Sequence, residues 1–303
     1  MYVADSFPIA DIVRLISHEA TPLSHQRLTG GVSADVVLLE FESEVGQKER
    51  AVFRALGDSA WKGLSLDSSR MQFELQEALF KGGLPVPRPL RLDTSCEIWP
   101  VPYVLMEFIA GSKEIDANDL TPALSVMAQA LHQIHSFDTK EAGGCLPAQE
   151  WDDPVRGALS YVPDTQVYRE LRSALRAWHV DAVDEVLLHG DYWPGNLLWL
   201  DGRLNAILDW EDAAIGSPES DIAGCRCELM ILFGQGAADR FTACYTELAG
   251  RALRDLPVWD VYASFAALAT MAQWGLPAEV EAHRRRRTEQ FAERAVGAVL
   301  AAQ

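Results

Sequence analysis

Three residues in the stretch 187–210 combine side-chain types and spacing that could support phosphate chemistry. Asp191 is followed five residues later by Asn196, and Asp209 comes thirteen residues after Asn196. Carboxylate and amide oxygens are hard ligands that suit Mg²⁺, an ion that keeps several waters and takes phosphate oxygens as further ligands. Asn196 and Asp209 are therefore candidate Mg²⁺ ligands. Asp191 could orient an attacking hydroxyl group, so the set would suit phosphoryl transfer.

A predicted β-hairpin would bring the two candidate ligands together. The dipeptide Asp201-Gly202 lies between two apolar runs and is typical of a two-residue turn in which both residues have positive φ. Extending the strands from this turn places Asn196 opposite Ile207 and leaves Asp209 just beyond the open end of the ladder. The loop before the hairpin carries Asp191, which could face the same ion without binding it. The alternative is that these Asp and Asn side chains only cap turns.

The composition indicates a globular chain that is large enough for one core or two lobes. Its 303 residues are 49% hydrophobic and 23% charged, which is ordinary for a soluble protein. The formal net charge of −18 argues against a nucleic-acid partner, because a phosphate backbone would be repelled. The basic run 284–287 is predicted to be a solvated helix face.

Neither a membrane partner nor a secretory signal is expected. The longest apolar stretches fall far short of the ~18 residues that a transmembrane helix needs, and the N-terminus lacks a basic segment before an apolar run. Five cysteines, an odd number, do not form a disulfide framework, and Cys225-x-Cys227 has no second pair at zinc-site spacing. These features favour free thiols in a reducing cytoplasm.

Residue patterns divide the chain into a strand-rich first third and a helix-rich remainder. Residues 35–41 and 51–56 are predicted to be antiparallel strands, because they are β-branched and apolar and flank a polar turn. The other predicted elements are a helix over 9–19 followed by a loop, a helix over 71–81, a strand over 103–108, and helices over 120–137 and 166–179. We therefore expect an N-terminal lobe of residues 1–108 and a helical C-terminal lobe of residues 109–303, with a ligand-binding cleft between them.

The motifs resemble those of the aminoglycoside phosphotransferase and choline kinase group of small-molecule kinases. His189-Gly190-Asp191-x4-Asn196 is similar to that group's catalytic loop, and residues 207–211 are similar to its metal-binding segment. Residues 216–223 resemble the segment that follows, in which an aspartate, here Asp221, braces the catalytic loop. The likeness runs from about residue 28 to residue 223.

This resemblance implies an α+β, two-lobed protein-kinase-like fold, with a small antiparallel-sheet N-lobe and a larger helical C-lobe. It implies an enzyme that transfers the γ-phosphate of ATP to a hydroxyl of a small molecule. Asp191 would be the catalytic base, and Asn196 and Asp209 would bind Mg²⁺. We interpret His189 as structural, with a general base as the alternative, and His135 as a packed, hydrogen-bonded histidine.

The resemblance also implies a set of nucleotide-binding residues in the N-terminal lobe. Three lie in a loop that would cover the phosphates: Gly30, Gly31 and Ser33. Three more would hold the adenine where the strand over 103–108 reaches the hinge: Met106, Glu107 and Ile109.

Two further positions depart from the group's pattern. Arg54 stands where such enzymes usually carry the lysine that reaches the α- and β-phosphates, and arginine keeps the charge and can bind phosphate through two N–H groups. Gln72 stands near the place of the glutamate that pairs with that cation. It predicts a hydrogen bond to Arg54 without an ion pair, with Glu74 or Glu77 as alternatives if the helix register differs.

The acceptor is expected to be a small molecule. Only eleven residues separate Asp209 from Asp221, which leaves no room for the long activation loop of a protein kinase. An aromatic and acidic lining would suit an aminoglycoside-, macrolide- or choline-like acceptor, a cation being held over an aromatic ring. The alternative is that these residues are core tryptophans and surface acids. The candidates are Trp151, Asp152, Asp153, Tyr192, Trp193, Glu211, Asp212 and Glu228.

Two other functions stay open at this point. The Arg54 and Gln72 pair could belong to a catalytically inactive nucleotide-binding protein of the same fold. A His-Gly pair after an apolar run can also mark the oxyanion loop of a hydrolase. The sequence has no Gly-x-Ser-x-Gly elbow, no Walker-type phosphate loop and no His-Glu-x-x-His motif, which argues against the hydrolase. The oligomeric state is not indicated.

Overall fold

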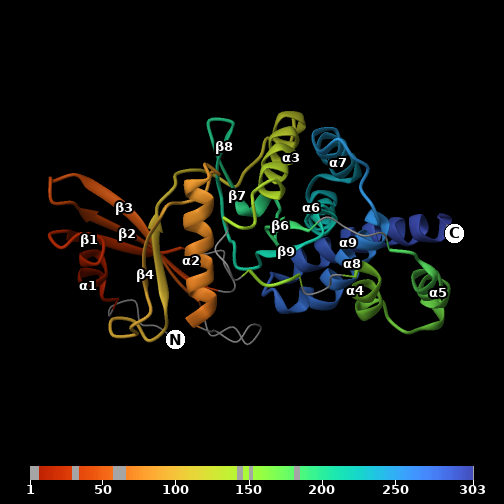
Figure 1. Ribbon diagram of the computed structural model, residues 1–303, viewed down its shortest axis with the longest axis horizontal. Coiled ribbons are helices and arrows are strands. Elements are labelled where there is room, and N and C mark those ends of the chain that lie inside the picture. Colours follow the sequence, from red (N-terminus) through yellow and green to blue (C-terminus); the bar gives the residue numbers. More distant parts are fainter. Residues whose placement is uncertain are drawn as a thin grey trace. The chain divides into compact units, whose positions relative to one another are not determined.

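The computed structural model describes residues 7–28, 34–56, 66–141, 146–149, 153–180 and 185–302. The chain forms two compact units (Figure 1). One contains Met1–Gly111 with Asn205–Leu208, and the other contains Ser112–Leu204 with Asp209–Gln303. The predicted phosphate-covering residues Gly30, Gly31 and Ser33 lie outside the described residues.

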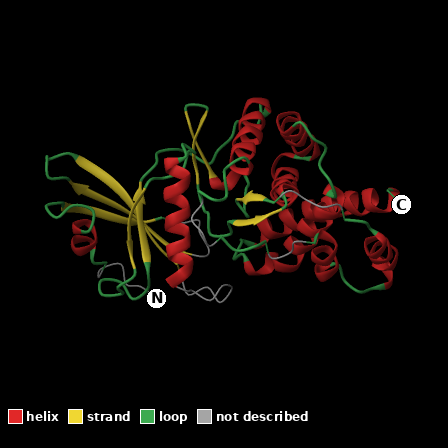
Figure 2. Ribbon diagram, viewed as in Figure 1, coloured by secondary structure: helices red, strands yellow, loops and turns green. Residues whose placement is uncertain are grey.

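The first unit is built on a five-stranded antiparallel sheet with the strand order β1-β2-β3-β5-β4 (Figure 2). Alternating apolar residues turn one face of the central strands into the core. Helix α1 packs against β1, and α2 packs against β4 and β5. The elements are α1 (Ile9–Arg14), β1 (Thr21–Arg27), β2 (Ala34–Glu42), β3 (Lys48–Leu56), α2 (Leu66–Lys81), β4 (Pro89–Asp93) and β5 (Tyr103–Glu107).

Aromatic side chains fill the core of this unit. The ring of Phe53 lies 5.2 Å from Phe7, 5.1 Å from Trp99 and 4.7 Å from Tyr103, measured between ring centroids. This packing anchors strand β3. Because neighbouring side chains alternate across a strand, Arg54 is directed to the face opposite the buried Phe53.

The second unit is mainly helical. Helix α8 packs against α4, α6 and α9, and α7 packs against α3 and α6. Its α-helices are α3 (Thr121–His135), α4 (Pro154–Tyr161), α5 (Arg169–Ala177), α6 (Pro218–Phe233), α7 (Gln235–Ala249), α8 (Leu256–Thr270) and α9 (Ala278–Ala301). Single turns of 3₁₀ helix occur at Gln166–Tyr168, Pro194–Asn196 and Met271–Gln273.

Two short pairs of strands hold the loops that carry the motifs. Strand β6 (Val186–Leu188) pairs with β9 (Ala214–Gly216), so the loop that leaves β6 at His189 starts beside the segment that enters β9. Strand β7 (Leu197–Leu200) pairs with β8 (Arg203–Ile207). The turn residues Asp201 and Gly202 have φ values of +51° and +73°, so the predicted hairpin and its turn type are confirmed.

The α+β class is confirmed, but four strands were missed: β1, β4, β6 and β9. The helix predicted over 9–19 ends at Arg14, and β1 begins at Thr21, where a loop was expected. Much of β1 is exposed and carries a proline, so its residues lack the apolar alternation by which a strand is recognised. Strand β4 was missed for a similar reason, since it begins at Pro89.

The prediction that residues 284–287 form a solvated helix face is wrong. Arg286 is exposed, but its three neighbours are partly buried. Arg284 donates to the carboxylate of Glu228, Arg285 to the carbonyl of Leu268 and Arg287 to the carbonyl of Met230. The guanidinium groups therefore fasten α9 to the rest of its unit.

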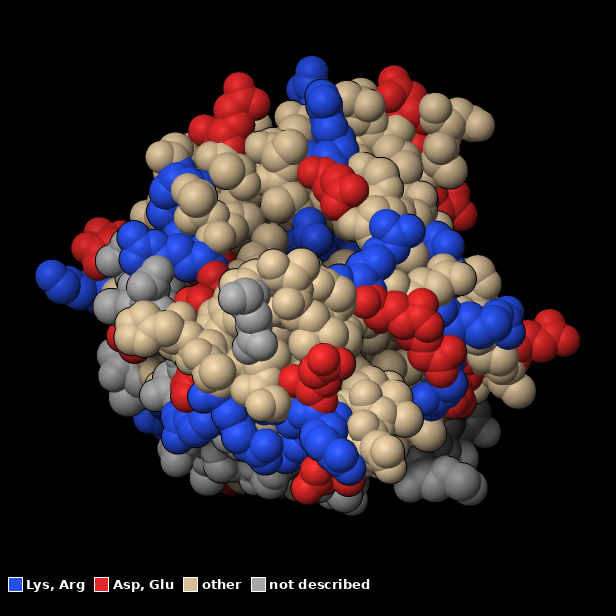
Figure 3. Space-filling view, turned by 90° about the vertical axis from the view of Figure 1, so that its right-hand side faces the viewer, with Lys and Arg blue, Asp and Glu red and all other residues tan. Residues whose placement is uncertain are grey.

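Charged side chains of both signs are spread over the surface. Lysines and arginines are intermingled with acidic residues on the face shown in Figure 3. Within the described ranges, no helix has both the length and the apolar character needed to cross a membrane.

Candidate active site

Asp221 on α6 holds the start of the predicted catalytic loop. Its Oδ2 accepts a hydrogen bond from the backbone N–H of His189 at 2.8 Å, and its Oδ1 accepts one from Gly190 at 2.9 Å. His135 contacts the same carboxylate at 3.2 Å through Nε2, and its Nδ1 lies 2.7 Å from the hydroxyl of Tyr245. The expected roles of Asp221 as a brace and of His135 as a hydrogen-bonded, buried histidine match these contacts.

These contacts keep the buried Asp221 ionised. Burial alone would raise the pKa of its carboxyl, but the hydrogen bond and charge of His135, the charge of His189 and the backbone N–H of His189 lower it below its ordinary value. A carboxylate that accepts two backbone N–H groups fixes the path of the loop more firmly than a neutral side chain would.

Gly190 is required by both its conformation and its surroundings. Its φ is +83°, in the left-handed region that favours glycine. A Cβ at this position would lie 2.0 Å from the carbonyl oxygen of Asp212. The loop at Gly190 and the segment that enters β9 are therefore packed backbone against backbone.

His189 is not among the residues that line the pocket described below. Its side chain is fully buried, its Nδ1 accepts from the backbone N–H of Asp191 at 3.2 Å, and its ring lies 4.5 Å from that of Trp210. A buried histidine that already accepts a backbone hydrogen bond suits the structural role expected of it.

Asn196 holds Asp191 through two hydrogen bonds. Its Nδ2 donates to the backbone carbonyl of Asp191 and to the carboxylate Oδ2, both at 2.9 Å. Both partners only accept hydrogen bonds, so the amide must present its NH₂ group to Asp191. The amide oxygen Oδ1 is thereby turned away from Asp191 and can serve another ligand.

Asp191 stands at the surface of the loop but is surrounded by protein on its inner side. The residue is exposed. Desolvation by the surrounding protein and the nearby carboxylate of Asp209 raise its pKa, while the charge of His189 and the side chains of Asn196 and Trp193 oppose the rise. The net effect is a carboxylate with a raised pKa and therefore a stronger proton acceptor.

Asp209 follows β8 and adopts φ of +66°. This left-handed conformation is uncommon for residues other than glycine, and aspartate is among those that tolerate it best. Its charge acts on Asp191, so the structure brings Asp191, Asn196 and Asp209 into one neighbourhood. The left-handed conformation at Asp209 interrupts the extended backbone after the strand, and its carboxylate lies near enough to Asp191 to raise the pKa of that residue.

The donor set fits Mg²⁺ better than a fully caged metal. Asn196 offers one amide oxygen and Asp209 one carboxylate. Among the described residues, no group of three His, Cys, Asp or Glu side chains is arranged to hold an ion. An ion that keeps waters and takes phosphate oxygens suits so sparse a set.

A family model described as the phosphotransferase enzyme family matches residues 24–252. The chain belongs to this family. The curated relative acyl-CoA dehydrogenase family member 11 of Gallus gallus is 27% identical over 169 residues, which are 50% of this chain and 22% of that protein. The chain thus spans about a fifth of the length of this relative.

Solved structures of phosphotransferases share the fold. A Ralstonia eutropha protein provisionally assigned as an aminoglycoside phosphotransferase superposes with a TM-score of 0.71 and 17% identity, covering 96% of both chains. The GDP and kanamycin complex of the aminoglycoside phosphotransferase APH(2")-IIIa gives a TM-score of 0.65 and 14% identity, covering 94% of this chain and 98% of that one. These likenesses confirm the predicted kinase-like fold.

In this phosphotransferase family member, the residues predicted to bind the nucleotide belong to the first unit. Nη1 of Arg54 donates to Oε1 of Gln72 at 2.8 Å, so the expected hydrogen bond between these two side chains is present. Glu77 instead pairs with Lys81 at 3.0 Å. Three residues lie at or just after the end of β5 and are half-buried: Met106, Glu107 and Ile109.

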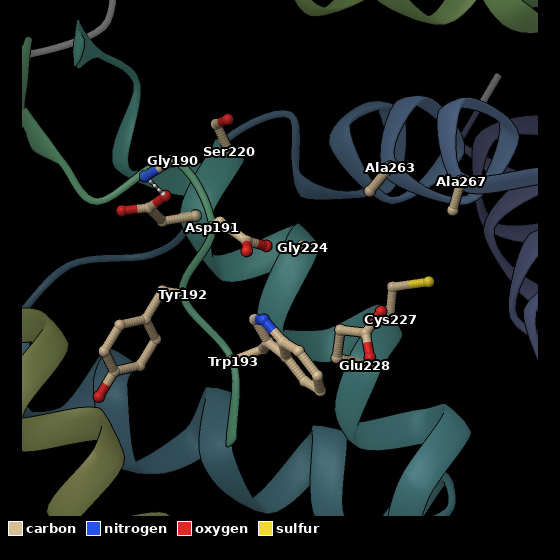
Figure 4. Close-up of a pocket in the computed structure, with 11 residues that line it drawn as sticks. Gly190, Asp191, Tyr192, Trp193, Ser220, Gly224, Cys227, Glu228, Ala263 and Ala267 are labelled. Atoms are coloured by element: carbon tan, nitrogen blue, oxygen red, sulfur yellow. Dashed lines mark hydrogen bonds between the residues drawn. The ribbon is translucent and has the colours of Figure 1, made fainter. Parts of the chain in front are cut away.

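A small pocket lies beside Asp191 within the second unit (Figure 4). Its volume is about 110 Å³. The loop lines it with Asp191, Tyr192 and Trp193, and the helices α6 and α8 supply the other walls. Three of the residues predicted to contact the acceptor line this pocket, namely Tyr192, Trp193 and Glu228.

The other predicted acceptor contacts have different places. Asp153 caps the N-terminus of α4, accepting from the backbone N–H of Val155 at 2.8 Å. Trp151 and Asp152 lie outside the described residues. Glu211 and Asp212 are not among the residues that line this pocket.

Sequence reasoning missed the far wall of the pocket. Ala263 and Ala267 on α8 line it, but alanines in an apolar helix carry no chemical signal. Arg284 was noticed only as part of a basic run, although it binds the pocket residue Glu228.

Proposed function

We propose that this chain is an ATP-dependent small-molecule kinase that transfers the γ-phosphate to a hydroxyl group, with Asp191 as the base. The observation that carries the proposal is the placement of the Asp191 carboxylate. It stands at an open pocket, held by Asn196, on a loop that Asp221 braces. Membership of the phosphotransferase family supports the transfer of a phosphate group. The use of ATP and of a small-molecule hydroxyl as the acceptor is proposed in addition.

Asn196 and Asp209 would hold Mg²⁺ at this site. When bound, the ion would offset negative charge on the phosphates. In the first unit, Arg54 would bind phosphate oxygens together with a loop containing Gly30, Gly31 and Ser33. Three residues at the end of β5 would hold the adenine: Met106, Glu107 and Ile109. The proposed lobes are residues 1–108 and 109–303.

Asp191 would act directly on the acceptor. Its carboxylate accepts a hydrogen bond from the acceptor hydroxyl, whose oxygen attacks the γ-phosphorus while the bond from that phosphorus to the β-phosphate oxygen breaks. The proton passes to Asp191 late, because a loose transition state needs little activation of the nucleophile. The raised pKa of Asp191 favours this transfer. Most of the acceleration would come from positioning and electrostatics.

The acceptor class is suggested only in outline by similar proteins. The structural neighbour in complex with GDP and kanamycin makes an aminoglycoside a natural test compound and makes GTP a second nucleotide to try. The name of the curated relative points to acyl-CoA chemistry, so a hydroxylated acyl thioester belongs in the same panel. Free thiols such as Cys225 and Cys227 are compatible with work in the cytoplasm.

The test is release of ADP or GDP in the presence of Mg²⁺ and a panel of acceptors. The panel comprises aminoglycosides, macrolides, choline, uncharged alcohols, sugars and a hydroxyacyl thioester. We expect at least one acceptor to be turned over, and Asp191→Ala to lower kcat by about 10³-fold or more while nucleotide binding, measured by calorimetry, changes little. Full turnover in Asp191→Ala would contradict the proposed role.

An inactive nucleotide-binding protein of this fold is the second candidate. The hydrogen bond that replaces an ion pair between Arg54 and residue 72 favours it. Calorimetric binding of nucleotide with no turnover of any acceptor would support this second candidate.

A further inference from the structure

The pocket beside Asp191 has an aromatic and acidic end that is not open to a ligand's cation. Trp193 and Glu228 lie next to each other at this end (Figure 4). A carboxylate beside a tryptophan face is the arrangement by which proteins hold ligand cations such as quaternary ammonium groups. In this chain a cationic side chain of the protein itself already lies beside both of these residues.

That cation is the guanidinium group of Arg284. Its Nη2 contacts both carboxylate oxygens of Glu228, at 2.5 and 2.6 Å. The two side chains are only 12% and 15% exposed. The pair joins α9 to α6, and its burial makes separation of the charges costly, because a buried charge that loses its partner is strongly destabilising.

Two tryptophans complete the box around Arg284. Its guanidinium carbon lies 5.8 Å from the ring of Trp193 and 5.5 Å from that of Trp274. Trp193 and Asp191 both line the pocket. The same tryptophan therefore lies beside the internal cation and beside the proposed base.

We propose that Arg284 takes the place of an acceptor's positive charge, so that the pocket selects uncharged alcohols and disfavours ammonium-bearing ones. This proposal rests on the proposed function of the site. It departs from the amine-bearing acceptor that the aromatic and acidic residues suggested in the sequence. The acidic residue expected to bind the amine is neutralised from within the chain.

The remaining walls suit a narrow, uncharged acceptor. Gly224 on α6 and Ala263 and Ala267 on α8 contribute only small side chains or none. The other carboxylates that line the pocket are committed elsewhere, because Asp221 accepts from the loop backbone and Asp191 is needed for the hydroxyl. A second cation at this end would meet the fixed charge of Arg284 without a free carboxylate to balance it.

A matched pair of probes tests the charge rule. Choline and 3,3-dimethylbutan-1-ol have the same shape, and they differ in that a quaternary carbon replaces the quaternary nitrogen. We expect the uncharged alcohol to bind the wild-type protein about tenfold more tightly than choline. Binding is followed by tryptophan fluorescence and calorimetry without nucleotide, so the result does not depend on turnover.

Variants at position 284 show whether Arg284 is the cause. Arg284→Met keeps a long side chain between the tryptophans and exposes the charge of Glu228, so choline should gain about tenfold in affinity. The double variant Glu228→Gln/Arg284→Met lacks both charges and should not gain choline binding. Arg286→Met, the same change at an exposed position on α9, should match the wild type. Circular dichroism checks that each variant is folded.

The outcomes separate this proposal from the kinase assignment. Failure of every alcohol to release ADP would remove the proposed function, while the binding comparison would still decide the charge rule. The proposal would be overturned if choline bound the wild type as tightly as the uncharged alcohol does. It would also be overturned if choline bound the wild type and Arg284→Met with equal affinity, or bound neither of them. If Arg284→Met does not fold, the wild-type comparison of the two probes decides alone.

Discussion

The indole of Trp193 occupies the space that a side chain at position 195 would need. A Cβ on Gly195 would lie 2.2 Å from Cη2 of this ring. Position 195 therefore needs a glycine, because any larger residue would collide with the ring of Trp193. The sequence Trp193-Pro194-Gly195 folds the indole back over its own loop, in the wall of the pocket that Asp191 also lines.

Gly195→Ala should therefore impair catalysis through Trp193. The added methyl must displace the indole, which lines the pocket beside Asp191 and contacts Arg284. We expect kcat to fall by about 10- to 100-fold in the ADP-release assay, because a misplaced group near the reacting atoms commonly costs this much. Gly236→Ala on α7, where φ is not positive and no atom lies within 4 Å of the added Cβ, is a control for the loss of a glycine. Equal kcat in the two variants would contradict the steric argument.

The buried carboxylate of Asp221 should give the protein an acid-sensitive component of stability. Its pKa is below the ordinary value of 3.8, so as the pH falls the unfolded chain takes up a proton before the folded one does. The free energy that it contributes to folding is complete above about pH 5, declines as the pH falls through about 4, and is lost below the lowered folded pKa.

Urea unfolding of wild type and Asp221→Asn between pH 7 and pH 3 measures this component. Because the change leaves a buried network short of its charge, we expect a loss of about 3 kcal/mol at pH 6, and the gap should narrow below about pH 4. Asp239→Asn, on a side chain that is 61% exposed, should change stability little. A gap that stays constant down to pH 3 would show that the charge of Asp221 is not the cause.

Arg54 should matter for the nucleotide and little for the acceptor. It lies on β3, and its hydrogen bond to Gln72 positions the guanidinium. Arg54→Ala should raise the Kd for ATP by about 10- to 100-fold, since charge-assisted contacts to phosphate are among the stronger hydrogen bonds. Lys48→Ala, at the exposed start of the same strand, serves as the control. Unchanged ATP affinity in Arg54→Ala would show that Arg54 does not bind the nucleotide.

Gln72→Glu examines the same pair from the other side. It would replace the hydrogen bond with an ion pair, so ATP affinity should stay within about threefold of the wild type. A loss as large as that of Arg54→Ala would mean that a carboxylate at position 72 prevents Arg54 from binding the nucleotide.

Local patterns in the sequence predicted the parts of the site that depend on neighbouring residues. Asp201-Gly202 between apolar runs was enough for the hairpin, because turn chemistry acts over a few residues. Arg284 could not be predicted in this way. It meets Glu228 across 56 positions, and only the packing of α6 against α9 brings them together. From the sequence alone, a run of four arginines is predicted to be solvated, and only the packing of its helix shows which of them are buried.

The double hydrogen bond from Asn196 to Asp191 leads to a final prediction. If Asn196 served only as a metal ligand, Asn196→Asp should keep activity or improve it, because a carboxylate binds Mg²⁺ more strongly than an amide does. An aspartate, however, cannot donate to the carbonyl and the Oδ2 of Asp191, and it would repel that carboxylate.

We therefore expect Asn196→Asp to lose about 10²-fold or more in kcat even at saturating Mg²⁺. The measurement is ADP release across a Mg²⁺ titration, compared with Asn205→Asp on β8, where the amide bonds to the carbonyl of Ala110. Recovery of wild-type kcat at high Mg²⁺ would show that Asn196 serves only as a metal ligand. A deficit that no Mg²⁺ concentration repairs would show that its NH₂ group holds the base in position.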